Sequence, residues 1–90
     1  MRFKFIKKKS TWLKKKRGIG FEEIQEIWQH PYYLDQRSDF PEQYRAIGWV
    51  KGKLYSVIYE ERDDKLGEYY HLVTLWNATK EERKLYEKFS

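Results

Sequence analysis

The 90-residue chain contains no cysteine, which excludes disulfide bonds and thiolate chemistry. Its two histidines are isolated in the sequence and form no cluster of metal ligands, so we expect no metal and no other cofactor. No apolar run approaches the length that spans a membrane, and the basic start lacks the apolar region of a secretion signal. We therefore expect a soluble, cytoplasmic protein with no membrane partner.

Basic residues are concentrated at the start of the chain. Residues 1–17 carry nine lysines and arginines and no acidic residue, whereas residues 18–90 carry ten basic and fourteen acidic residues. The two parts have charges of +9 and −4, which give the net charge of +5. A basic end on an acidic body indicates an anionic partner, most commonly nucleic acid; the alternative is a charge run that is simply solvated.

The third quarter of the chain predicts the sheet. Two runs rich in apolar residues, 45–50 and 53–60, flank Lys51-Gly52, which is typical of a β-hairpin. A third run, 69–76, follows a short polar connection at 61–67. Such a short connection favours an antiparallel neighbour, so the three runs predict a meander.

A short strand and a basic helix are predicted before the sheet. Residues 1–5 alternate apolar and basic side chains, as a strand does. Residues 7–18 predict a helix that ends at Gly18, with Trp12 and Leu13 as anchors to the core and lysines over the remaining surface.

A second helix is predicted at residues 21–29, because its apolar residues recur on one stripe. His30-Pro31 ends it, since the residue before proline is pushed out of helical geometry. Residues 35–43 are expected to be a loop, because Pro41 and two aspartates argue against regular structure.

Strict alternation divides the last strand into two faces. It places Tyr70, Leu72, Thr74 and Trp76 on one face and Tyr69, His71, Val73 and Leu75 on the other. His71 is then a structural histidine, unless this assignment of faces is wrong and it serves as a base.

After the strand, Thr79 and Glu82 predict the capping box of a closing helix. The sequence thus predicts one α+β domain over residues 1–90, an antiparallel sheet of about four strands with two helices before it and one after.

The chain resembles the BrnT-type toxins of bacterial type II toxin-antitoxin pairs, small ribonucleases related in fold to RelE. That family has a first helix leading to Lys-His-Gly, then Phe-Glu-Glu, an Ile-Gly strand, a hairpin strand ending near Tyr-Thr-Glu-Arg, and a closing Ala-Thr-x-x-Glu-Arg-x-x-Tyr. The matching segments here are Lys16-Arg17-Gly18-Ile19-Gly20-Phe21-Glu22-Glu23, Ile47-Gly48, Tyr59-Glu60-Glu61-Arg62 and Ala78-Thr79-Lys80-Glu81-Glu82-Arg83-Lys84-Leu85-Tyr86. The closing segment is the most specific of them.

The resemblance implies RNA cleavage without a metal by a cluster that includes Lys16, Arg17, Glu61 and Arg62. Attack of a ribose 2′-hydroxyl on its phosphate needs a group that takes a proton, one that gives a proton, and cations around the developing charge. Two positions depart from the family. Arg17 stands in place of histidine and cannot shuttle a proton, and Trp76 stands in place of arginine and can stack a base but cannot clamp a phosphate.

The resemblance also implies two partners, RNA and a cognate antitoxin whose DNA-binding part lets the complex repress its own operon. The residues expected to contact RNA are Lys7, Lys8, Lys14, Lys15, Trp76 and Arg83. The alternative is a relative that binds RNA or the antitoxin and has lost turnover.

Overall fold

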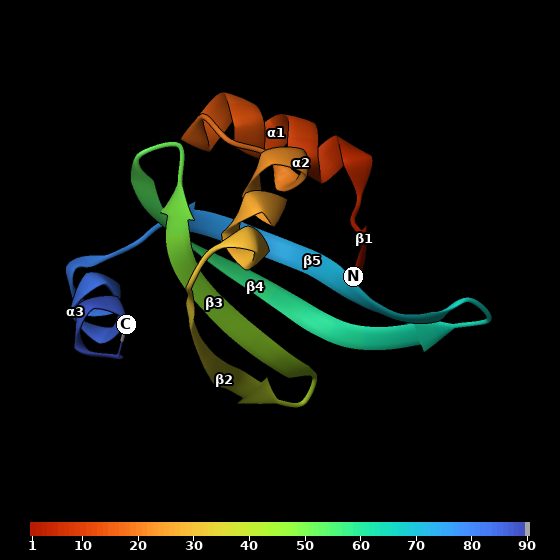
Figure 1. Cartoon of the computed structure of the whole chain (residues 1–90). Coiled ribbons are helices and arrows are strands. Elements are labelled where there is room, and N and C mark those ends of the chain that lie inside the picture. The colour runs from red at the N-terminus through yellow and green to blue at the C-terminus, as the bar shows by residue number, and fades with distance from the viewer. Residues whose placement is uncertain (90) are drawn as a thin grey trace.

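Residues 1–89 are described by the computed structural model, in which three helices, a 3₁₀ helix and one sheet form an α+β fold (Figure 1). In chain order the elements are β1 (Arg2–Lys4), α1 (Lys7–Arg17), α2 (Phe21–Ile24), the 3₁₀ helix η1 (Gln25–Gln29), β2 (Tyr33–Asp39), β3 (Glu42–Val50), β4 (Lys53–Asp64), β5 (Gly67–Asn77) and α3 (Lys80–Phe89). The predicted fold class is confirmed, whereas the sheet differs in its details.

The sheet has five strands in the order β1-β5-β4-β3-β2 and is mixed. Strands β2 to β5 form the expected antiparallel meander. β1 lies beside β5 and runs parallel to it, with Arg2 opposite Tyr69 and Lys4 opposite His71. The prediction of an antiparallel sheet of about four strands is therefore wrong in strand number and in the direction of β1. A parallel neighbour requires a long crossover, and a three-residue strand carries no signal that identifies its partner.

Residues 35–43, expected to be a loop, belong to β2 and β3, which meet at a tight turn over Phe40-Pro41. Pro41 lies in the turn itself, where the missing N–H breaks no ladder hydrogen bond. β2 is also an edge strand, so its polar side chains can reach water. The polar connection at 61–67 is likewise mostly strand, because β4 and β5 continue as an exposed ribbon to a turn at Lys65-Leu66.

The second predicted helix is present, but only its first turn is α-helical and the rest is η1. Its apolar stripe still faces the core, since Phe21, Ile24 and Ile27 are fully buried. η1 packs closely on β3 at Gly48, where an added Cβ would lie 2.7 Å from Cγ1 of Ile27. Only glycine allows this approach without a shift of the helix.

Helices α1, α2 and η1 cover one face of the sheet, which we call the covered face. Its core contains Leu13, Phe21, Ile24 and Ile27 from the helices and Ala46, Val57, Tyr59, Leu72 and Leu75 from the strands. Leu72 and Leu75 share this face although strict alternation separates them, because a β-bulge at Val73 adds one residue to β5. The predicted faces of the last strand are therefore wrong beyond the bulge. His71, Thr74 and Trp76 share the opposite face, which we call the open face.

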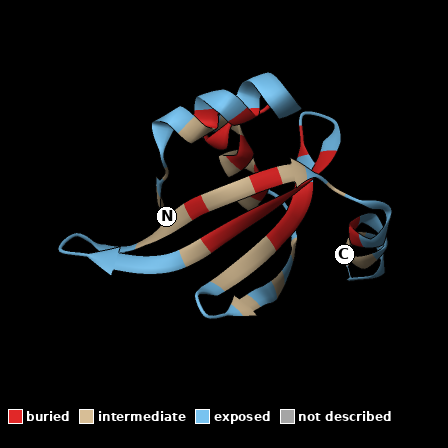
Figure 2. Cartoon of the chain, turned by 180° about the vertical axis from the view of Figure 1, so that it is seen from behind, coloured by how far each residue is buried: buried red, intermediate tan, exposed pale blue. Residues whose placement is uncertain are grey.

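The open face is covered by a helix at one end only. α3 packs there, with the rings of Trp49 and Tyr86 6.4 Å apart and those of Tyr33 and Phe89 5.7 Å apart. Figure 2 views the molecule from behind, with α3 to one side of the strands. The predicted capping box of α3 is confirmed, since the Glu82 N–H donates to Thr79 Oγ1 at 3.2 Å and the Thr79 N–H donates to Glu82 Oε1 at 2.9 Å.

Candidate functional site

Two of the lysines expected to contact RNA are paired with the start of α2. Lys7 forms an ion pair with Glu22, and Lys14 forms one with Glu23. Hydrogen bonds from Lys7 and Ser10 lower the pKa of Glu22 to about 2, and Lys14 lowers the pKa of Glu23. The hollow of about 480 Å³ between the two helices is therefore lined by both signs of charge. It is a poor site for a phosphate.

The other basic residues of α1 form no ion pair in the part of the chain that the structure describes. Among them, Lys8, Lys15, Lys16 and Arg17 are exposed. They lie on the outer surface because Ser10 and Leu13 point into the fold. These cations can bind phosphate without first giving up a protein partner.

Trp12 is placed differently from the expectation. Leu13 is fully buried and does anchor α1, whereas the Trp12 side chain is 51% exposed. The two residues are neighbours in a helix and therefore point about 100° apart, so a single helix face cannot bury both. Trp12 instead lies among the lysines on the outer surface of α1.

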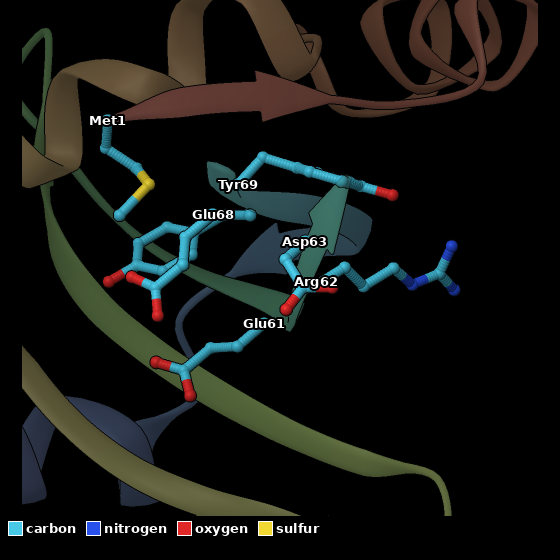
Figure 3. Close-up of a pocket in the computed structure, with 7 residues that line it drawn as sticks. Met1, Glu61, Arg62, Asp63, Glu68 and Tyr69 are labelled. Carbon is cyan, nitrogen blue, oxygen red and sulfur yellow. The ribbon is translucent and has the colours of Figure 1, made fainter. Parts of the chain in front are cut away.

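Glu61 and Arg62 point to opposite sides of β4. Figure 3 shows Glu61 and Glu68 on one side of the strand and Arg62 on the other. Glu61, Asp63 and Glu68 line a hollow of about 220 Å³ together with Arg62, Met1, Tyr69 and Tyr70, so its lining has three carboxylates and one guanidinium. This concentration of carboxylates repels phosphate, so the hollow does not suit RNA.

The structure does not bring the four predicted catalytic residues together. Lys16 and Arg17 end α1 close to the β3–β4 turn, where Gly18 and Lys51 line the same hollow. Glu61 and Arg62 lie near the opposite end of β4, toward the β4–β5 turn (Figure 1). Glu61 lies eight positions beyond Lys53 along β4, which corresponds to about 26 Å.

Trp76 and Arg83 both lie at the α3 end of the open face. The Trp76 indole N–H donates to Glu82 Oε1 at 2.9 Å, and the Arg37 guanidinium lies 5.0 Å from the centre of the indole ring. Arg83 lies 5.3 Å from the centre of the Trp49 ring. Trp76 is half-buried in a network that includes Arg45, so its ring is occupied by protein contacts.

A cluster of polar side chains lies on the part of the open face that α3 does not cover. It includes His71, whose role the sequence analysis left open. Cross-strand pairing places His71 opposite Glu60 on one side and opposite Lys4 on the other, where the Lys4 ammonium donates to Asp64 Oδ2 at 2.7 Å. Gln43 Nε2 donates to Glu60 Oε2 at 2.8 Å. Glu60 also accepts a hydrogen bond of 3.0 Å from Arg62 Nε. The name His71 cluster is used below for Lys4, Gln43, Glu60, Arg62 and His71. The signal that could have revealed it is the pairing of Glu60 and Arg62 at two-residue spacing, but the bulge at Val73 hid which face His71 occupies.

Burial and two nearby cations favour a neutral imidazole at His71. Burial lowers the pKa of His71, the charges of Arg62 and Lys9 lower it further, and Glu60 offsets part of this effect. Hydrogen bonds from Gln43 and Arg62 lower the pKa of Glu60, against the opposing effect of burial, so Glu60 is ionised. A neutral histidine can take a proton, and the guanidinium held next to it can bind a phosphate oxygen.

The comparisons with known proteins leave the family open. No protein-family model matches the chain, and no curated protein does either. Across the part of the chain that the structure describes, no group of three or more His, Asp and Glu side chains is placed to hold a metal ion. No helix within residues 1–89 is long and apolar enough to cross a membrane.

Proposed function

We propose that the protein binds RNA and cleaves it without a metal, as an endoribonuclease toxin related to the BrnT and RelE-like families. The observation that carries the proposal is the His71 cluster, which combines a neutral base with an adjacent guanidinium on the open face. The order of a strand, two helices, a meander and a capped closing helix is also the order that the resemblance implies.

His71 has the role that Arg17 cannot perform. In this mechanism, His71 takes the proton of a ribose 2′-hydroxyl, and the 2′-oxygen attacks the adjacent phosphorus. The 5′-oxygen leaves with a proton from the Lys4 ammonium, which first releases its ion pair with Asp64, and this gives a cyclic phosphate end and a free 5′-hydroxyl. Arg62 stabilises the extra negative charge on the phosphate oxygens, because a charged donor beside the reacting group acts most strongly in the transition state.

The biological setting follows from the same resemblance. The toxin acts in the cytoplasm, arrests growth by cutting RNA, and is neutralised by a cognate antitoxin. The DNA-binding part of that antitoxin lets the complex repress its own operon.

Cleavage of total RNA by purified protein, freed of any partner, tests the proposal. We expect discrete cleavage that survives a metal chelator and that falls about 100-fold or more in His71→Ala, since general-base catalysis contributes about 10²- to 10⁴-fold. His30→Ala is the matched control, because His30 is an exposed histidine at the end of η1 and away from the cluster.

Variants at the residues that the resemblance singles out complete the test. Lys16→Ala and Glu61→Ala report whether the resemblance identified catalytic groups that lie outside the His71 cluster. Cleavage that a chelator abolishes, or that His71→Ala and His30→Ala retain equally, contradicts the mechanism.

A second candidate is a relative that binds RNA or the antitoxin without turnover. The separation of Lys16 and Arg17 from Glu61 and Arg62 along β4 favours it, because the resemblance requires them to act together. Intact RNA that still shifts in a gel identifies this case.

A further inference from the structure

Trp12 lies at the centre of the exposed surface of α1. The residues four and three positions before it are Lys8 and Lys9, and those three and four positions after it are Lys15 and Lys16. In an α-helix these four positions surround the central residue on the surface. With a side chain that is 51% exposed, the indole is an aromatic surface within a ring of ammonium groups.

The four lysines form no ion pair within residues 1–89, unlike Lys7 and Lys14 on the flank that faces α2. α1 itself contains no acidic residue. Like charges three and four residues apart destabilise a helix, so this arrangement is unfavourable in the free protein. A bound polyanion removes that repulsion.

We infer that Trp12 and these four lysines bind a single-stranded segment of RNA, with one unpaired base stacked on the indole and the neighbouring phosphates on the lysines. The inference rests on the proposed function for the nature of the ligand. Stacking on an aromatic side chain requires a base whose flat face is free, which a duplex does not offer within its stack.

RNA fits this surface better than an anionic membrane does. A helix that lies in a membrane interface needs a continuous apolar face. In α1 the apolar residues are Trp12 and Leu13, and Leu13 is fully buried in the core, so only one indole remains for a bilayer.

Fluorescence anisotropy with a labelled 12-nucleotide oligouridine tests the inference. The oligonucleotide carries 2′-O-methyl groups, which prevent cleavage, so binding is measured whether or not the protein is a ribonuclease. We expect Trp12→Ala to weaken binding about 5- to 100-fold, the range for loss of one base stack, and Trp12→Phe to retain most of it. Leu66→Ala is the control, because Leu66 is an exposed apolar residue in the β4–β5 turn and should leave affinity unchanged.

Two comparisons complete the experiment. An RNA duplex without unpaired bases should bind wild type and Trp12→Ala equally, and thermal melting should show that all variants fold. Equal affinity of wild type and Trp12→Ala for the single strand overturns the inference, as does Trp12-dependent binding only to phosphatidylglycerol vesicles. Binding that depends on Trp12 without any cleavage of total RNA supports the inference and contradicts the proposed catalysis. Failure of the binding inference can therefore be distinguished from failure of the proposed ribonuclease activity.

Discussion

His71 is half-buried on β5, and its surroundings determine the pH range in which it can accept a proton. Burial and the charges of Arg62 and Lys9 lower its pKa below the ordinary value of 6.5. The imidazole is therefore neutral at pH 7 and becomes protonated only as the pH falls through that lower pKa. We expect single-turnover cleavage to be constant near neutral pH and to decrease in acid, with an inflection below pH 6.5.

Substitution of Arg62 tests whether the decrease of cleavage in acid comes from the titration of His71 or from another group. Arg62→Gln removes a cation beside the imidazole and leaves Glu60 without that partner, and both changes favour the protonated histidine. The inflection should move to higher pH, whereas Arg62→Lys should leave it nearly in place. An inflection that is the same in wild type and Arg62→Gln assigns the titration to a group other than His71.

The sequence could not predict how the candidate site residues are arranged. Glu61 and Arg62 are adjacent in sequence, and they point to opposite sides because they lie in a strand rather than in the expected turn. One inserted residue at Val73 places His71 on the same face as Glu60 and Trp76. A bulge depends on pairing with β4, so local alternation in β5 could not reveal it.

The attachment of α3 to the sheet depends on the buried carboxylate of Glu82, which is 5% exposed. It accepts hydrogen bonds from the Thr79 N–H and the Trp76 indole at 2.9 Å each and lies 3.3 Å from Arg45. Glu82→Ala should lower the free energy of unfolding by about 2–4 kcal/mol, because it leaves buried donors without a partner. Urea denaturation measures the change. Glu81→Ala, an exposed neighbour in the same turn, should cost less than about 1 kcal/mol.

The same carboxylate makes this stabilisation dependent on pH. Burial alone would raise the pKa of Glu82, but hydrogen bonds from Thr79 and Trp76 and the charge of Arg45 lower it below 4.5. The contribution is fully present above the unfolded-state pKa and is lost as the pH falls through the lower folded-state pKa. The difference in stability between wild type and Glu82→Ala should therefore shrink as the pH falls below 4.5, and a difference that stays the same down to the acid unfolding of the protein would contradict this role.

Elements with local signals could be predicted from the sequence, and those that depend on distant contacts could not. The capping box of α3 is contained in four consecutive residues, Thr79 to Glu82, and is present as predicted. The turn of β3 into β4 required only Lys51-Gly52. By contrast, β1 finds its parallel partner more than sixty residues away, and η1 departs from α-helix where it packs against Gly48.

The distribution of charge over the whole molecule sets the salt dependence that the proposed RNA binding should have. Nine basic residues and no acid lie in residues 1–17, and within the described structure the excess is free mainly on the outer surface of α1. Each lysine that replaces a counterion on a single strand makes the binding constant fall by about 0.7 logarithmic units for a tenfold rise in salt. With Lys8, Lys9, Lys15 and Lys16 engaged, the logarithm of the binding constant should fall with the logarithm of salt at a slope of about −3.

Removal of two lysines should reduce the slope in proportion. Lys8→Ala with Lys15→Ala should bring it to about −1.4, whereas Lys65→Ala, in the distant β4–β5 turn, should leave it unchanged. Anisotropy titrations of the 2′-O-methyl oligouridine at four salt concentrations measure these slopes. An affinity for RNA that does not vary with salt would show that the basic surface of α1 makes no phosphate contacts. Binding would then have to come from the open face, where Asp64 pairs with Arg2 and Lys4, and Glu60 pairs with Arg62.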